Sequence, residues 1–223
     1  MILSDTATLL EYETKKNSFV LLLRQELSQA KQEFDMEAAE ISGEIFEGLD
    51  NTPLMTSFFE NCTFRRCKFI GLSLKNCRFV ECAFENCDLS VANLTGSTFR
   101  NVRFIECKAV GVNWSLTSGI HSSQFIACKL NDTSFAKLDL RHIIFEQCQL
   151  EGSDFRETRL DKAKFPESRL AGAQFNKTNL LEADFSHAHD YFFDPRNNKL
   201  KNTKVSLPEA IGLLEVLGAT LTN

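Results

Sequence analysis

The sequence has no long apolar segment and no pattern of an export signal. Its longest N-terminal apolar run, FVLLL from Phe19, ends at Arg24, and no basic stretch leads into it. A signal peptide needs about 7–15 apolar residues and a membrane helix about 20, so we expect neither. The sequence therefore predicts a cytoplasmic protein that does not contact a membrane and whose cysteines stay reduced.

Motifs of enzyme active sites are also missing. The sequence contains no glycine-rich phosphate loop and no paired-carboxylate signature. No histidine has a nucleophile at a recognisable motif spacing; the four are His121, His142, His187 and His189. We therefore expect a protein that is not an enzyme, with no catalytic residues and no cofactor.

Aromatic residues that carry a polar atom are scarce: 2 Tyr and 1 Trp stand against 20 Phe. This imbalance indicates many equivalent buried positions that offer no partner to a polar ring atom. An apolar residue recurs every five residues from Phe59 to Trp114, and it is large at every position except Ala109. The pattern resumes from Ile120 to Phe185 after one extra residue, and a small residue stands two positions before most of the large ones. Two of every five side chains are therefore expected to point inward.

A second period, of twenty residues, groups these positions into columns. One column consists of phenylalanine alone: Phe64, Phe84, Phe104, Phe125, Phe145, Phe165 and Phe185. Neither the helical period of about 3.6 nor the strand period of about 2 fits so long a stretch. Four units therefore make one turn of a coil that rises by one strand spacing, about 4.8 Å. The predicted fold class is an all-β solenoid filled by Phe and Leu from four sides.

The cysteines all fall in the small slot of the five-residue unit. A pair such as Cys62 and Cys67 lies at the edge of zinc-ligand spacing, but Ser, Thr, Ala and Val fill the same slot elsewhere, so we expect no metal. Stacked cysteines come within disulfide range, yet parallel side chains keep their Cβ atoms too far apart. Reduced thiols that act as small apolar side chains are expected instead.

Several units resemble the repeat A-(D/N)-L-x-x of the pentapeptide-repeat family. The resemblance covers about 59–190 and implies a right-handed quadrilateral β-helix. The units that match it best are ANLTG (92–96), SDFRE (153–157), TNLLE (178–182) and ADFSH (183–187).

The tail and one internal stretch are similar to a narrower group within that family. They are YFFDPRNNKLKNTKVSLPEAIGLLEVLG, from Tyr191 to Gly218, and CKAVGVNW at 107–114. The group comprises bacterial proteins that protect DNA gyrase, namely the quinolone-resistance (Qnr) and albicidin-resistance proteins. The resemblance implies that a C-terminal helix joins two rods into a homodimer, and that the rod resembles duplex DNA to the topoisomerase.

The sequence predicts three segments. Residues 1–45 form an acidic, helical N-terminal segment, and residues 46–190 form the β-helix with a one-residue bulge at about 115–119. Residues 191–223 form a tail with a capping and dimerisation helix.

An amphipathic helix is expected in the N-terminal segment, begun by Asn17 or Ser18. Two interpretations stay open: the helix caps one end of the rod, or it is an arm that binds a partner, which the acidic flank from Glu33 favours. Its apolar positions are Phe19, Leu22, Leu23, Leu27, Ala30 and Phe34.

The C-terminal helix has its own start and stop signals. Ser206 and Glu209 fit a capping box around Pro208, with Ser206 as N-cap, and Gly218 fits a C-terminal stop. Two uses of the helix stay open: a cap over the backbone edges of the last coil alone, or a cap that is also a dimer interface. The residues expected at that interface are Leu207, Ile211, Leu214 and Leu217.

The charges do not by themselves predict DNA mimicry. Outward residues of both signs occur on all four sides, and the near-neutral body disfavours direct binding of nucleic acid. The resemblance implies a non-enzymatic protein that binds DNA gyrase, or topoisomerase IV, and protects it from quinolone-type or other poisons. A repeat scaffold for a different protein partner is the alternative. The partner contact is expected at the bulge: Ser115, Leu116, Thr117, Ser118 and Gly119.

Overall fold

The computed structural model describes residues 40–54 and 56–219. The chain divides into two compact units, Met1–Ala38 and Ala39–Asn223, and all the elements below belong to the second. The amphipathic helix expected from Asn17 or Ser18 lies outside the described residues.

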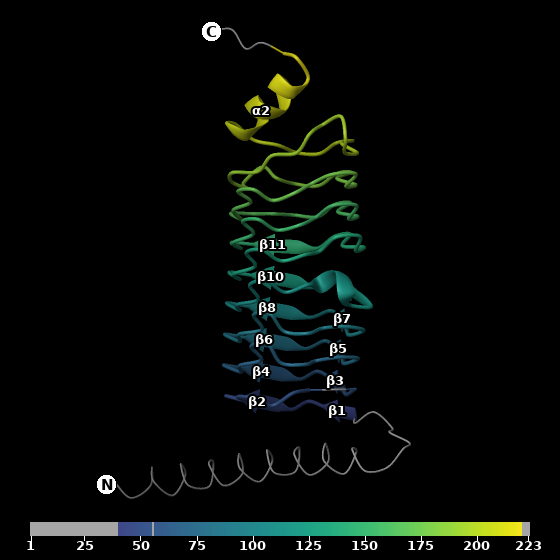
Figure 1. Cartoon of the computed structure of the whole chain (residues 1–223), viewed down its shortest axis with the longest axis vertical. Helices are drawn as coiled ribbons and strands as arrows, with labels where there is room; N and C mark the ends of the chain where they lie inside the picture. Colours follow the sequence, from purple (N-terminus) through teal and green to yellow (C-terminus); the bar gives the residue numbers. More distant parts are fainter. Residues whose placement is uncertain (1–39, 55, 220–223) are drawn as a thin grey trace, which may run out of the picture. The chain divides into compact units, whose positions relative to one another are not determined.

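Very short parallel strands build the second unit (Figure 1). One sheet has the order β1-β3-β5-β7-β9 and the other β11-β10-β8-β6-β4-β2, and isolated bridges continue the ladders as far as Lys204. The chain thus forms the expected right-handed quadrilateral β-helix. The strands are β1 (Glu40–Ser42), β2 (Ile45–Glu47), β3 (Phe58–Glu60), β4 (Thr63–Arg65), β5 (Arg78–Val80), β6 (Ala83–Glu85), β7 (Thr98–Arg100), β8 (Arg103–Ile105), β9 (Gly119–His121), β10 (Gln124–Ile126) and β11 (Ile144–Glu146).

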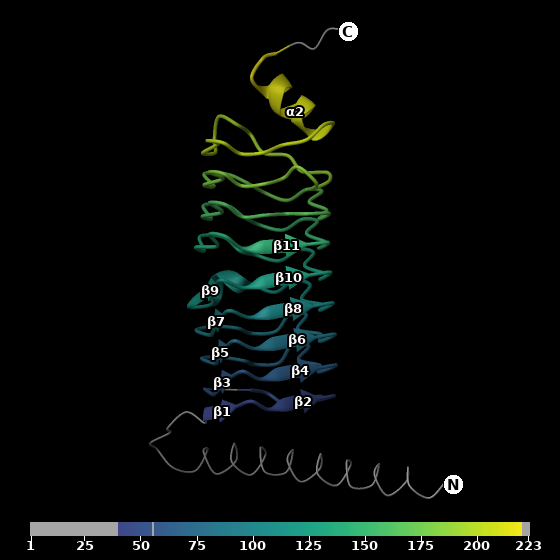
Figure 2. The same ribbon diagram turned by 180° about the vertical axis from the view of Figure 1, so that it is seen from behind.

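The strands stack one above another, as the view from behind shows (Figure 2). Phe64 pairs with Phe84, and Phe104 pairs with Phe125 across the extra residue. In both pairs the ring centroids lie 4.6 Å apart and the planes are nearly parallel. Such a ring pair contributes about 0.5–1.5 kcal/mol beyond the area that it buries. The predicted phenylalanine column is therefore confirmed.

The first coil departs from the twenty-residue period. Ile41 on β1 pairs with Phe59, and Phe46 on β2 pairs with Phe64, so each step is only 18 residues long. Phe46 is buried and stacks on Phe64 at 4.8 Å between ring centroids. The phenylalanine column therefore extends to residues that precede the five-residue pattern.

Corners of the coil require left-handed backbone at the last position of most units. Asn61 and Asn86 have φ values of 52° and 54° there, and glycine serves the same purpose at Gly71. Gly and Asn adopt this conformation at little cost, whereas a β-branched residue is strained in it. Val91 is such a β-branched residue, with φ 51°.

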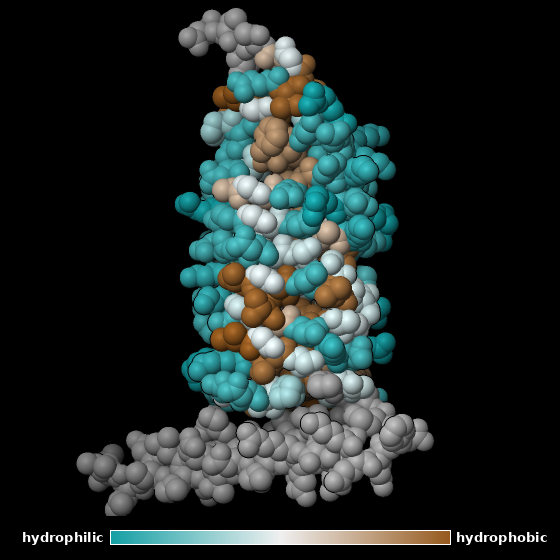
Figure 3. Space-filling model, in the orientation of Figure 1, coloured by the Kyte–Doolittle hydropathy of each residue, from teal (hydrophilic) through white to brown (hydrophobic). Residues whose placement is uncertain are grey.

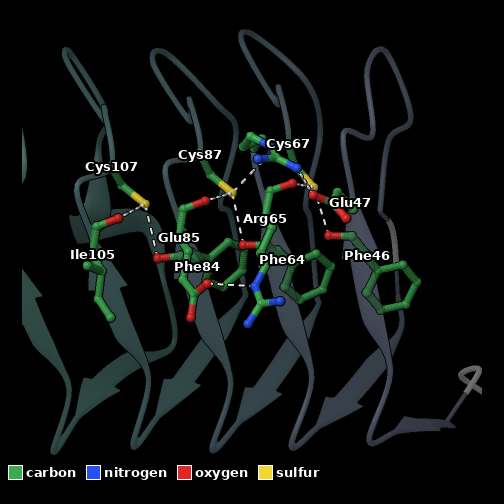
Figure 4. A network of polar contacts seen from close by, with 11 residues as sticks. Phe46, Glu47, Phe64, Arg65, Cys67, Phe84, Glu85, Cys87, Ile105 and Cys107 are labelled. Carbon is green, nitrogen blue, oxygen red and sulfur yellow. Dashed lines mark hydrogen bonds and ion pairs between the residues drawn. The ribbon is translucent and has the colours of Figure 1, made fainter. Parts of the chain in front are cut away.

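The cysteines line the wall of the coil (Figure 4). Cys87 Sγ donates to the carbonyl oxygen of Phe64 at 3.2 Å, and Cys107 Sγ donates to that of Phe84 at 3.2 Å. Ser168 Oγ does the same to the carbonyl of Phe145 at 2.8 Å, which explains why this slot accepts Cys, Ser and Thr. All eight cysteines are buried free thiols.

Burial makes two of these thiols, Cys77 and Cys148, poor nucleophiles. It raises the pKa of the Cys77 thiol to about 11, and it also raises the pKa of Cys148. A thiol with a raised pKa stays protonated at neutral pH. It is then a poor nucleophile, because only the thiolate is reactive. All eight cysteines are buried in the small slot of the wall, as expected from the sequence.

The C-terminal helix α2 (Glu209–Val216) is confirmed, and Gly218 follows it with φ 80°. The predicted capping box is wrong. The helix begins after Pro208 without a side-chain cap, because the capping groups bond to the last coil instead. Glu209 Oε1 accepts from the backbone N–H of Asp190 at 3.2 Å, and the Ser206 N–H donates to Tyr191 Oη at 2.9 Å.

Helix α2 is the only α-helix of the described residues, and it is far too short to cross a bilayer.

Candidate interaction surfaces

The extra residue of the sequence forms a single turn of 3-10 helix, η1 (Trp114–Leu116). The register across it is Thr98 with Gly119, a step of 21 residues. Trp114 takes the inward slot and is fully buried, with its ring stacked on Phe135 at 5.9 Å between centroids. The insertion therefore lies where the interior holds its largest side chain.

Hydrogen bonds hold the bulge against the neighbouring coils. Asn113 Oδ1 accepts from the Ser115 N–H at 3.1 Å, and Thr117 Oγ1 donates to the Trp114 carbonyl at 2.7 Å. Ser118 Oγ donates to the carbonyl of Gly96 on the preceding coil at 3.1 Å. The turn is therefore fixed by its own polar side chains.

The five residues predicted at the bulge differ in their exposure. Leu116 has half of its surface exposed, and Ser118 is exposed. Ser115 is partly buried, whereas Thr117 and Gly119 are buried and serve the turn itself. Only Leu116 and Ser118 can offer much surface to a partner, and Leu116 is the apolar residue of the two.

Gly119 is required by the backbone. Its φ of 148° is outside the range that other residues adopt easily, and a Cβ there would collide with the imidazole of His121. The sequence predicts Gly119 at a partner contact, and the structure gives this residue a conformational role.

A second apolar surface lies on the C-terminal helix. Leu213, which the sequence analysis missed, is the buried residue that anchors α2, and Gly212 packs near the ring of Phe192. Leu207, Leu214 and Leu217 remain exposed, with Leu207 at 75%, and Ile211 is partly buried. Most of the residues predicted at the dimer interface thus keep their apolar surface available in one copy.

Among the exposed apolar residues that were not singled out from the sequence, two lie on successive coils. Ile70 is 51% exposed and Val91 is 61% exposed. Both occupy outward positions of the repeat, on coils that precede the bulge in the chain. The signal available was an aliphatic residue at a position that should point to solvent.

Several outward carboxylates form ion pairs with a neighbouring Lys or Arg. Asp139 pairs with Arg141 at 2.8 Å, and the hydrogen bond from Arg141 lowers the pKa of the Asp139 carboxyl. Asp184 pairs with Lys204 at 3.0 Å across two coils. Within the described ranges, no three His, Cys, Asp or Glu side chains are grouped so that they could hold a metal.

Comparisons with known proteins concern both sequence and fold. A family model described as a pentapeptide repeat region matches residues 57–118 and 118–189. No curated protein matches the sequence.

Two trypsin-treated variants of QnrB1, a plasmid-mediated fluoroquinolone resistance protein, have similar folds. Their TM-scores are 0.60 and 0.56 at 16% and 20% sequence identity. The alignments cover 84% and 83% of this chain and 100% and 98% of the QnrB1 chains. HetL, a pentapeptide repeat protein involved in heterocyst differentiation regulation in a Nostoc cyanobacterium, aligns with 83% of this chain and 93% of its own at 12% identity, and its TM-score of 0.44 is too low to carry an argument.

Replacing Gly119 by Asn tests the conformational role of this residue. We expect Gly119→Asn to lower the free energy of unfolding by about 1–3 kcal/mol, because Asn does not tolerate this φ. The sole tryptophan, Trp114, should report the change through its fluorescence during denaturant unfolding. Gly71→Asn is the matched control, since Gly71 has φ 65° and open space around its Cα. It should change stability by less than about 1 kcal/mol, and equal losses in the two variants would contradict the assignment.

Proposed function

Because the chain belongs to the pentapeptide repeat family, we propose that it is a cytoplasmic, non-enzymatic protein that binds DNA gyrase and protects it from quinolone-type or other gyrase poisons. The observation that carries the proposal is the likeness of its β-helix to QnrB1 over nearly all of the QnrB1 chain. At 16% and 20% identity that likeness establishes the fold, and the shared activity is the step that we propose. Topoisomerase IV is the alternative enzyme.

The exposed apolar residues support a function in protein binding. Large apolar side chains are exposed at Leu116 on the bulge, at Val91, and at Leu207 and Leu217 beside α2. Groups of exposed apolar side chains on a folded protein are typical of protein interfaces. A protein that acts by binding an enzyme needs such surfaces and needs no chemistry of its own.

The proposal does not depend on DNA mimicry. Mimicry would need unpaired acidic charge along one side of the β-helix, and the carboxylates of Asp88, Asp154 and Asp184 each pair with a nearby Lys or Arg. Protection is better explained by occupation of a protein surface on the enzyme, which would exclude the poison or destabilise its complex.

Helix α2 supports the second part of the proposal, that two copies form a homodimer. Leu213 anchors the helix on the last coil, so Leu207, Leu214 and Leu217 are left for another molecule. A second copy that presents the same residues would cover them symmetrically. The helix would then be both the cap of the coil and the dimer interface.

A supercoiling assay tests the proposed function. Purified gyrase, relaxed plasmid and a fluoroquinolone are mixed with increasing amounts of this protein, and we expect supercoiling activity to be restored. Leu116→Asp should raise the amount needed by about tenfold or more, because a charge then enters an apolar contact. Ile45→Asp, an exposed apolar residue on β2, is the matched control and should behave like the native chain. If the native chain neither protects nor inhibits gyrase at any concentration, the proposed function is refuted.

The molecular mass in solution tests the dimer. The native chain should have twice the mass of one copy of 25.3 kDa. Leu214→Asp should weaken the dimer by at least about 100-fold, since an unpaired carboxylate would be buried at its centre. Ile45→Asp should stay dimeric. A native monomer, or a dimer that Leu214→Asp leaves intact, would rule out this interface.

A further inference from the structure

One part of the β-helix surface is almost free of charge. We call it the uncharged face and define it as residues 70–76, 90–96 and 110–118. Lys75 is its single ionisable residue, in a chain of which 25% is charged. The same side continues upward through residues that include Asp132, Lys137, Glu151, Asp154, Arg156, Glu157 and Lys177.

The three segments of the uncharged face lie on consecutive coils. The Gly71 N–H donates to the Ser90 carbonyl at 2.9 Å, and the Val91 N–H donates to the Val110 carbonyl at 3.0 Å. Figure 3 shows apolar and neutral atoms gathered at the height of β4 to β10, with mostly hydrophilic atoms on the coils above them. The exposed Ile70, Val91 and Leu116 belong to this face.

Val91 lies on this face in a backbone conformation that is unfavourable for a β-branched residue. It is β-branched and has a φ of 51°, at a corner where the coils before and after it have Gly71 and Gly111. Glycine in the next coil makes room for it, because a Cβ on Gly111 would lie 3.2 Å from Val91 Cγ1. This conformation is costly for a β-branched residue, and such strain motivates a hypothesis of function.

Two hydroxyl groups on this face lack partners. Among the described residues, neither Ser73 Oγ nor Ser90 Oγ makes a hydrogen bond, although both atoms are shielded from solvent. A serine hydroxyl can rotate toward a new donor or acceptor at small cost. The face therefore combines exposed aliphatic groups with unused hydrogen-bonding capacity, as the centre of a protein interface does.

We propose that the uncharged face is the docking surface for an apolar, uncharged protein segment of the topoisomerase, an inference that rests on the proposed function. Charge matching selects this occupant, because nucleic acid or an anionic lipid surface would need several cations and the face has only Lys75. The face also continues into the predicted contact at the bulge, so that one surface runs from Leu116 down to Ile70. Depletion of charge lowers the cost of desolvation when the segment binds.

Val91→Asn separates binding from folding. Asn already occupies the equivalent left-handed position at Asn61, Asn86 and Asn101, so the variant should melt at the same temperature as the native chain or higher. Its affinity for purified gyrase, measured by surface plasmon resonance without DNA, should fall by about tenfold or more, since an exposed apolar contact is lost. Ile70→Asn should weaken binding similarly, and Ile45→Asn, on β2, should bind like the native chain.

Two further measurements complete the test: the dependence of affinity on salt and the molecular mass in solution. Between low and high salt, affinity should change by less than about threefold, because the contact is not ionic. Unchanged affinity in Val91→Asn and Ile70→Asn, an equal loss in Ile45→Asn, or a steep salt dependence would overturn the docking surface while leaving gyrase binding in place. A change of Val91→Asn from dimer to monomer would reassign the face to a second copy. If the native chain does not bind gyrase, both this inference and the proposed function fall.

Discussion

Stacking of equal side chains on equal positions of successive coils is the constraint on which the structure depends. Backbone groups of one coil pair with the coils before and after it, so each inward side chain must lie directly over its counterpart. The ring pairs Phe64 with Phe84 and Phe145 with Phe165 satisfy this requirement, and no large gap or overlap could be accommodated along such a column. The small slot follows from the same geometry: it has room for Ala or Val, and a Cys, Ser or Thr there can bond to the carbonyl of the coil before it.

Because the interior is filled with side chains, only the outer surface and the ends of the β-helix are available for binding. The inward positions are occupied by close-packed Phe, Leu and Trp114, so variation is tolerated mainly at the three outward positions of each unit. Surface chemistry can then change from coil to coil without disturbing the fold. The uncharged face and the charged coils above it illustrate this independence, because both rest on the same column of inward residues.

Regular features of the structure could be predicted from the sequence, because the five-residue pattern records which side chains point inward. The phenylalanine column, the wall position of the cysteines and the insertion before Gly119 all follow from it. The place of Phe46 in the phenylalanine column escaped prediction because its step to the next coil is 18 residues, which does not fit the twenty-residue period. The start of α2 was wrong because Ser206 and Glu209 bond to residues of the last coil, a tertiary effect that local capping rules do not contain. The outward residues that form one surface could not be grouped from the sequence, because they lie on different coils and are far apart in the chain.

The most direct test of this account compares the loss of one stacked ring with the loss of one exposed ring. Phe125→Ala removes a fully buried ring between Phe104 and Phe145, whereas Phe192→Ala removes a ring that is half exposed beside α2. Denaturant unfolding should show a loss of about 3–5 kcal/mol for Phe125→Ala and less than about 1 kcal/mol for Phe192→Ala. Similar losses in the two variants would contradict the claim that the stacked columns hold the β-helix together.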